Sequence, residues 1–350
     1  MPSAHVLPYR TARTACLGLL AIVATSAAAC GDKATQRIVS AESGAIDVRM
    51  PKPAFTLTDT DGNPFAFAER TAGKVTFLEF GYTNCPDICP VHMANLATVL
   101  GKLAPSDRMR TAVVFVSIDP DRDSGAVLRK WLDSFDATFV GLTGTRDELN
   151  AVQAAVGFGA ATVSTAQNGA VDVTHAAPLI VFTADDTAHV MYPFGTRQAD
   201  WTRDIPRLLA RTGSGAPRPV PVHVERAYIV TPAGNAPAVI YLTVRNPAAA
   251  PDTLLSIATS SVGPASLHET EQAPAAGMVN MRPVGAFVVG PNATIRLAPG
   301  GAHAMIMPVQ AKLLRGARVP MTLLFARSGL IHVNATVIGF ADVDSATTPR

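Results

Sequence analysis

The sequence is poor in charge and in cysteine. Of its 350 residues only 16% are Asp, Glu, Lys or Arg, and the formal net charge is +2. A basic surface that could bind nucleic acid is therefore not expected, and we predict no nucleic-acid partner. The chain has four cysteines, and beyond the first 30 residues only Cys85 and Cys89 remain. Any thiol chemistry outside the N-terminal segment must use these two.

A long membrane-spanning run is also missing at the N-terminus. The uncharged run Thr14–Cys30 is too short for a comfortable span. Arg10 and Arg13 precede it and small residues end it, which is the pattern of an export signal. The small residues before Cys30 resemble a bacterial lipobox, which implies that Cys30 is lipidated; ordinary cleavage or an uncleaved anchor stays open. We expect an exported protein at the periplasmic face of a bacterial membrane, where disulfides are permitted.

The sequence is long and apolar enough for two domains, since 48% of its residues are hydrophobic. Composition shifts and a Gly/Pro-rich stretch suggest the division. We predict a signal peptide at 1–30, a flexible spacer at 31–50, an α/β domain at 51–212, a linker at 213–222, a β domain at 223–343 and a tail at 344–350.

In the first domain, apolar strands alternate with helical segments. The predicted strands are a strand and turn from Phe55, then Val75–Tyr82, Thr111–Ile118, Thr138–Leu142, Leu179–Thr183 and Ala188–Phe194. The predicted helices are Pro86–Leu103, Ser124–Phe135, Arg146–Val156 and Asp200–Arg211. This alternation favours a parallel-rich sheet with an antiparallel hairpin at its edge, as in a thioredoxin-like α/β fold.

In the second domain the helical pattern disappears. Short strand candidates separated by Pro, Gly and Asn turns predict an all-β sandwich or barrel of Greek-key type. These candidates are His223–Val230, Ala238–Asn246, Leu254–Thr259, Ala265–Thr270, Met278–Pro283, Thr294–Leu297, His303–Met307, Pro320–Phe325 and Ile331–Ile338.

The stretch Gly81–Met93, GYTNCPDICPVHM, carries the first candidate site. Cys85 is predicted in the loop after a buried strand and Cys89 in the first turn of the next helix, so that their sulfurs face one another. A helix N-terminus favours thiolate over thiol. The pair therefore indicates a redox dithiol or a soft-metal site, with a structural disulfide as the plainer alternative. His175, just before a predicted strand, is the candidate third ligand.

Three motifs in order, GYTNCPDICP, VSIDPDRDS and VTHAAPLIVF, resemble the Sco/SenC family of copper proteins, which serve cytochrome c oxidase assembly. The resemblance implies a thioredoxin fold with copper ligands Cys85, Cys89 and His175. Two thiolates and an imidazole suit Cu(I), with Cu(II) as a further state, and the thiolates can also form a disulfide. His92 is expected to pack or lie at the surface rather than bind metal, and His189 to be exposed.

Histidine and methionine gather in the second domain. The cluster consists of His268, Met278, Met281, His303, Met305 and Met307. His303 and Met305 are two residues apart, so a strand would point both to one face. Thioether and imidazole without thiolate favour Cu(I).

This cluster resembles the periplasmic copper chaperones called PCuAC, which have a cupredoxin-like fold. Met281 is followed after 21 residues by His-Ala-Met, and the flanks LHET, MVNMRPV and LAPGGAHAMIM also match. The resemblance implies the ligands His268, Met281, His303 and Met305. The twelve residues between His268 and Met281 exceed the family's usual spacing, so Met278 remains open as an alternative ligand. Met307 is expected to pack.

Together these patterns predict an exported, lipid-anchored copper metallochaperone with two Cu(I) sites. It would deliver copper to an oxidase subunit and could also reduce that subunit's cysteines. One alternative is a thiol-disulfide oxidoreductase or peroxiredoxin-like enzyme with a β docking domain. Another is a copper storage or resistance protein.

Overall fold

The computed structural model describes residues 44–165, 171–175, 178–211, 220–234, 236–259, 261–272 and 279–347. The predicted signal peptide with Cys30, the greater part of the predicted linker, and Met278 lie outside these residues. All described residues fall in one compact unit, Arg37–Arg350. None of the helices formed by this part of the chain is long and apolar enough to cross a membrane.

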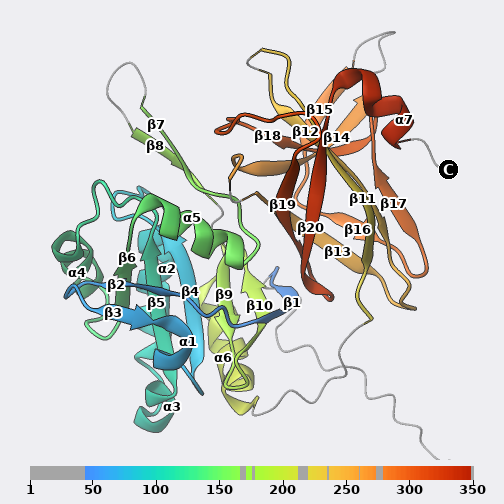
Figure 1. Cartoon of the computed structure of the whole chain (residues 1–350). Coiled ribbons are helices and arrows are strands. Elements are labelled where there is room, and N and C mark those ends of the chain that lie inside the picture. Colours follow the sequence, from blue (N-terminus) through green and yellow to red (C-terminus); the bar gives the residue numbers. More distant parts are fainter. Residues whose placement is uncertain are drawn as a thin grey trace, which may run out of the picture. The chain divides into compact units, whose positions relative to one another are not determined.

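The α/β part is coloured from blue to yellow-green in Figure 1. Its strands are β1 (Ile46–Pro51), β2 (Thr56–Asp59), β3 (Pro64–Ala66), β4 (Val75–Gly81), β5 (Thr111–Ser117), β6 (Val140–Thr143), β7 (Thr162–Thr165), β8 (Val171–Thr174), β9 (Leu179–Phe182) and β10 (Thr187–Tyr192). Its helices are α1 (Phe67–Arg70), α2 (Ile88–Leu100), α3 (Pro105–Met109), α4 (Gly125–Asp133), α5 (Arg146–Ala155) and α6 (Gln198–Ala210).

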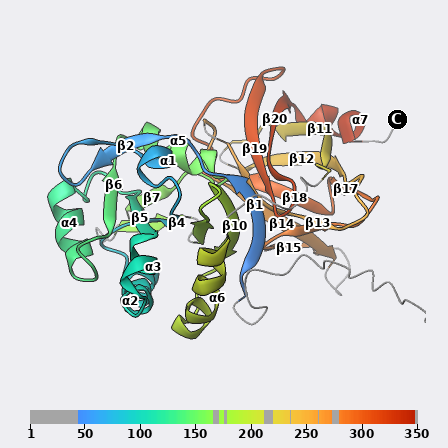
Figure 2. The same cartoon turned by 90° about the horizontal axis from the view of Figure 1, so that it is seen from below.

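Eight strands form one sheet in the order β1-β10-β9-β4-β5-β6-β2-β3. The central strands β4, β5 and β6 are parallel, and β9 joins β4 in antiparallel fashion. Both faces are covered: apolar residues of α2, α4 and α6 share one core with β4 and β5, and residues of α5 share the other. Figure 2 shows α2 and α6 side by side. The thioredoxin-like prediction is confirmed.

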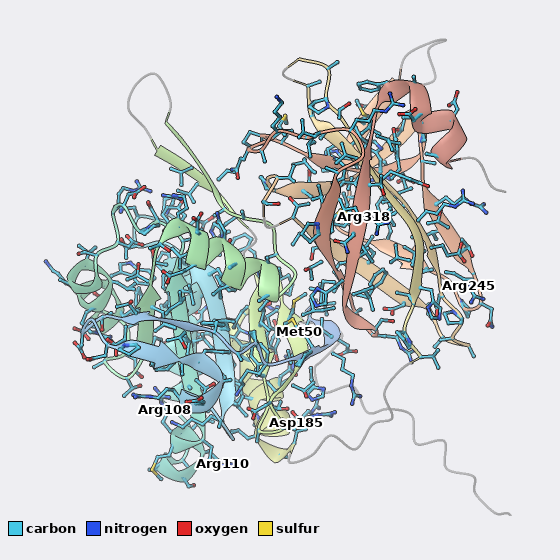
Figure 3. The ribbon with its side chains drawn as sticks, in the orientation of Figure 1. Met50, Arg108, Arg110, Asp185, Arg245 and Arg318 are labelled. Carbon is cyan, nitrogen blue, oxygen red and sulfur yellow. The ribbon has the colours of Figure 1, made fainter. Side chains whose placement is uncertain are left out.

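The N-terminal edge of this sheet differs from the prediction. The end of the predicted spacer is strand β1, which pairs with β10 and so covers the hairpin that was expected at the edge. Val48 and Met50 alternate with more exposed neighbours and enter the core, which explains the strand. His189 on β10 was expected to be exposed, but it is buried and lies 2.9 Å from the carboxylate of Asp185, which Figure 3 labels.

The β part continues the chain. Its strands are β11 (His223–Val230), β12 (Ala238–Arg245), β13 (Asp252–Ala258), β14 (Ala265–Gln272), β15 (Val279–Pro283), β16 (Phe287–Val289), β17 (Thr294–Leu297), β18 (Ala302–Ile306), β19 (Arg318–Phe325) and β20 (Gly329–Ile338). A short 3-10 helix, η2 (Phe340–Asp342), and helix α7 (Val343–Thr347) follow. The helix includes residues 344–347 of the predicted tail.

Ten strands form one continuous sheet in which β15, β14, β18 and β12 are neighbours, and β17 also pairs with β12. All pairs are antiparallel except β11 with β20. The sheet curls around an apolar core, to which β12, β14, β18, β19 and β20 all contribute. This confirms the all-β prediction and places three donor-bearing strands next to one another.

Candidate metal centres

The cysteine loop lies where the sequence predicts. Cys85 follows β4 in the loop, and its N–H donates to the carbonyl of Tyr82 at 3.1 Å. Cys89 is the second residue of α2 and is fully buried. Both are free thiols, and Cys85 lies close enough to Cys89 to contribute to the shift of its pKa. The two cysteines are therefore neighbours, as the sequence predicts.

Burial dominates the chemistry of Cys89. It raises the pKa of the thiol far above its usual range, and the nearby Glu79 adds to the shift. Since desolvation disfavours the charged form, it outweighs the helix N-terminus that was expected to favour thiolate. Without metal, Cys89 therefore holds its proton at neutral pH.

A glycine allows the strand to pass close to this sulfur. A Cβ on Gly81, the last residue of β4, would lie 2.6 Å from Cys89 Sγ and 2.7 Å from Phe115 Cζ. No side chain fits at such distances without displacing one of these groups. Gly81 thus belongs to the packing of the thiol pair.

The carboxylate of Asp123 anchors the cysteine loop. Its fully buried carboxylate accepts hydrogen bonds from the Thr83 N–H at 2.9 Å, the Thr83 hydroxyl at 2.6 Å and the Ser117 hydroxyl at 2.6 Å. The two other aspartates of the VSIDPDRDS motif have different partners. The structure pairs Asp119 with Arg122, and Asp121 with Arg146 on the surface. The signal for Asp123 was its place in the VSIDPDRDS motif.

His175 lies between β8 and β9, beside the cysteine loop. Its ring meets the ring of Tyr82 edge-on, with centroids 5.9 Å apart, and Arg122 lies 5.8 Å from the Tyr82 centroid. Within the described part of the chain, no three His, Cys, Asp or Glu side chains are close enough to hold a metal ion. The structure therefore places Cys85 beside Cys89 and His175 beside the loop. These three side chains are not close enough together to form a complete metal site.

A buried polar pair lies in the same core as Cys89. His92 Nδ1 is 3.3 Å from Glu79 Oε1, and both side chains are almost completely buried. Burial raises the pKa of Glu79. The ring of His92 packs against Trp201 at 5.7 Å, which confirms that His92 packs in the core. The sequence missed Glu79, because it stands within an apolar strand.

The second centre is built by strand register. In the β14–β18 pair His268 is directly opposite His303, and their rings are stacked with centroids 5.8 Å apart. Met305 is opposite Ser266, and in the β14–β15 pair Met281 is opposite Thr270. Since paired residues and residues two apart share a face, His268, Met281, His303 and Met305 all lie on one face. The structure places Met281 with the other candidates, whereas Met278 is outside the described residues.

The hydrogen bonds of His268 and His303 show which of their ring nitrogens remain available to a metal ion. His303 donates its Nδ1–H to the carbonyl of Gly301 at 3.0 Å, which leaves Nε2 as a potential metal donor. His268 Nε2 is 2.8 Å from the Ser266 hydroxyl, and its buried Nδ1 has no hydrogen-bond partner among the described residues. Burial and the neighbouring His303 lower the pKa of His268. At neutral pH it is thus a neutral imidazole, the form that binds metal.

Both halves of the chain match family models. Residues 46–210 match SCO1/SenC, and residues 222–337 match the family described as "Putative lipoprotein LpqE-like". A Stutzerimonas stutzeri protein named "Putative copper-binding protein" is 31% identical over 143 residues, which are 40% of this chain and 69% of that protein. Protein SCO2, mitochondrial, of Saccharomyces cerevisiae is 40% identical over 98 residues, which are 28% of this chain. The match spans only 32% of the yeast protein.

Solved structures are similar to each half. Bradyrhizobium japonicum ScoI with copper bound is 28% identical, with a TM-score of 0.41, over 46% of this chain and 99% of that one. The apo PCuAC domain from PmoF1 is 28% identical, with a TM-score of 0.29, over 34% of this chain and 93% of that one. By the family match of residues 46–210 and the identity to the S. stutzeri protein, the chain belongs to the SCO1/SenC family.

Proposed function

We propose that this protein is an exported copper metallochaperone that binds Cu(I) at two sites and serves the copper centres of cytochrome c oxidase. The observation that carries the proposal is the face shared by β15, β14 and β18, where two imidazoles and two thioethers gather. These uncharged soft donors suit Cu(I) and are poor ligands for hard cations. The name of the S. stutzeri relative, a "Putative copper-binding protein", supports the same cargo.

At the first site, Cys85 and Cys89 would supply two thiolates and His175 an imidazole. Because burial keeps Cys89 protonated, uptake of Cu(I) there must release a proton. Copper would thus supply the positive charge that makes a buried thiolate tolerable. His175 would complete the set by turning from Tyr82 toward the sulfurs.

Membrane attachment belongs to the same proposal. Lipidation at Cys30 would hold the protein at the periplasmic face of the membrane, where an oxidase subunit receives copper. The spacer before β1 would then lift the α/β domain, 51–212, from the surface, and the linker 213–222 would connect it to the β domain, 223–343. Globomycin-sensitive processing and metabolic labelling with a fatty acid, both lost in Cys30→Ala, are the expected results.

An anaerobic Cu(I) titration against a competing chelator tests the two-site proposal. The reduced protein should bind two tight equivalents. Cys85→Ala/Cys89→Ala should remove one of them and Met281→Ala/His303→Ala the other. If the second double variant keeps both equivalents, the chaperone role of the β domain is wrong.

The adjacent thiols favour a second candidate, reduction of disulfides in the target. Two neighbouring free thiols can form an internal disulfide as they pass two electrons to a substrate disulfide. This activity needs both cysteines but not His175. A His175→Ala variant that still reduces a disulfide substrate but loses the first copper equivalent would show that the two roles are separate.

A further inference from the structure

Strand β18, which carries His303 and Met305, ends at Ile306, and a third soft donor, Met307, follows it directly. Ala304 and Ile306 are fully buried in the core of the β part. Side chains alternate across a strand, so His303 and Met305 lie on the opposite face, and Met307 is the next position in that alternation. Met307 was expected to pack, but the residue is 62% exposed. A single exposed methionine is ordinary. What needs explaining is that Met307 continues the row of soft donors formed by His303 and Met305.

The pairing with β14 gives each of these donors a level, which we define as one pair of opposite residues on this face of the sheet. His303 is level with His268, and Met305 is level with Ser266. The N–H of Met307 donates to the carbonyl of Pro264 at 3.2 Å, which continues the same register. Successive levels are about 6.6 Å apart, the rise of two strand residues. Met307 is thus one level from Met305 and about 13 Å, two levels, from the imidazole pair.

Met281 marks the other end of the row. It is opposite Thr270, which is one level beyond His268. The four proposed ligands therefore occupy the three levels from Met281 to Met305, and Met307 follows on the side away from Met281. Because Met307 is about 13 Å from the imidazole pair, it cannot be a ligand of an ion centred on the imidazoles. Neighbouring thioethers on flexible side chains can nevertheless share an ion.

We propose that Met307 is a transfer ligand, through which Cu(I) leaves the second site toward an acceptor with soft donors. This rests on the proposed function of the site. The Met307 sulfur would form a bond to the ion held by Met305 while the bonds to Met281 and to the two imidazoles break, and the donors of the acceptor would then replace both thioethers. Copper stays monovalent, the thioethers are neutral, and no proton or electron is exchanged. The exposed end of the row is then where the acceptor's thiolate or imidazole would approach.

The test uses the full chain in a Cys85→Ala/Cys89→Ala background, in which only the second site binds copper. Cu(I) is loaded anaerobically, and its withdrawal by bathocuproine disulfonate is followed by stopped flow. Met307→Leu should slow withdrawal about tenfold, while the equilibrium affinity stays unchanged. Met307→His, which restores a soft donor, should recover the rate. Met109→Leu replaces a methionine that is 72% exposed on α3 and should change nothing.

Equal rates for Met307→Leu and Met109→Leu would overturn the transfer role. A tenfold loss of affinity in Met307→Leu would overturn it too, because Met307 would then be an ordinary ligand. A background protein that binds no Cu(I) would overturn the proposed function, and the transfer role with it. Circular dichroism of each variant establishes that the β domain is folded.

Discussion

At the scale of single residues, the carboxylate of Asp123 has the clearest structural task. Its oxygens accept three hydrogen bonds, two from Thr83 and one from Ser117. In Asp123→Asn the amide offers one acceptor oxygen and a donor nitrogen, so a buried donor loses its partner. We expect a loss of about 1–3 kcal/mol in the free energy of unfolding, measured by urea denaturation. Cys85 should also react faster with iodoacetamide, because its loop loosens.

Asp121→Asn is the matched control. Asp121 lies four positions from Ser117 in the same motif, but it is exposed and pairs with Arg146 on the surface. Such pairs contribute about 0–1 kcal/mol. If the two variants lose equal stability and their Cys85 thiols react equally fast, the anchoring role of Asp123 is wrong.

Asp136 should make stability depend on pH. Burial would raise its pKa, but hydrogen bonds from Thr138 and from Arg108, labelled in Figure 3, outweigh burial and lower the pKa. A carboxyl whose folded pKa is lowered stabilises the fold above its unfolded value, about 3.9, and loses this contribution as the pH falls through the folded value. Urea unfolding at a series of pH values should show this loss.

The variant Asp136→Asn isolates that contribution. It should be less stable than the parent at pH 7, and the difference should vanish at the acid end of the series. Asp133→Asn, which removes an exposed partner of Arg129, should follow the parent closely. A difference for Asp136→Asn that is constant with pH would contradict the assignment.

At this scale the sequence proposes candidate residues, whereas their environments come only from the fold. Cys85, Cys89 and His175 are candidates from motifs, since spacing is written in the chain. The protonation of Cys89 and the task of Asp123 depend on neighbours that only folding supplies. Burial beside Glu79 decides the first, and contact with Thr83, 40 positions away, decides the second. No local sequence pattern predicts that Glu79 lies beside Cys89 or that Thr83 contacts Asp123.

At the scale of elements, the second centre depends on one antiparallel pairing. β14 and β18 align His268 with His303, so removal of either imidazole should abolish tight binding there. We expect His268→Ala to lower the Cu(I) affinity of the second site at least tenfold, about 1.4 kcal/mol. Chelator competition in the cysteine-free background measures this affinity.

His332→Ala provides the comparison on another strand. His332 is an exposed residue of β20 whose Nδ1 lies 3.2 Å from the Thr322 hydroxyl. Nothing in the proposed site depends on it, so its removal should leave the affinity unchanged. Equal weakening by both substitutions would mean that histidines bind Cu(I) without regard to register.

The strands show which elements could be predicted. β11 and β17 have the predicted bounds, because turn residues flank their apolar patterns. β1 and the β7–β8 hairpin were missed, since their patterns are short and their neighbours polar. The i, i+2 relation of His303 to Met305 could be read from the chain. The alignment of His268 with His303 could not, because it depends on how two strands distant in sequence meet.

At the scale of the whole molecule, the chain joins two donor chemistries. The α/β part offers thiols that must lose protons and that can be oxidised. The β part offers thioethers and a histidine of lowered pKa, which need no deprotonation at neutral pH. Under the proposed function, Cu(I) would be accepted by the second part under oxidising conditions and passed to the first when its thiols are reduced. A single chain with both parts suggests transfer between them.

The predicted linker, 213–222, should make transfer of Cu(I) between the two sites independent of protein concentration. A linker of this length gives an effective concentration on the order of millimolar between sites. We expect Cu(I) loaded on the second site to reach the first, followed by thiolate-to-copper absorbance, at one rate at every dilution. After cleavage at a protease site inserted within 212–219, the rate should rise with concentration and at about 1 µM fall by about a thousandfold. The uncleaved insertion variant is the control, and equal rates before and after cleavage would show that the tether has no part in transfer.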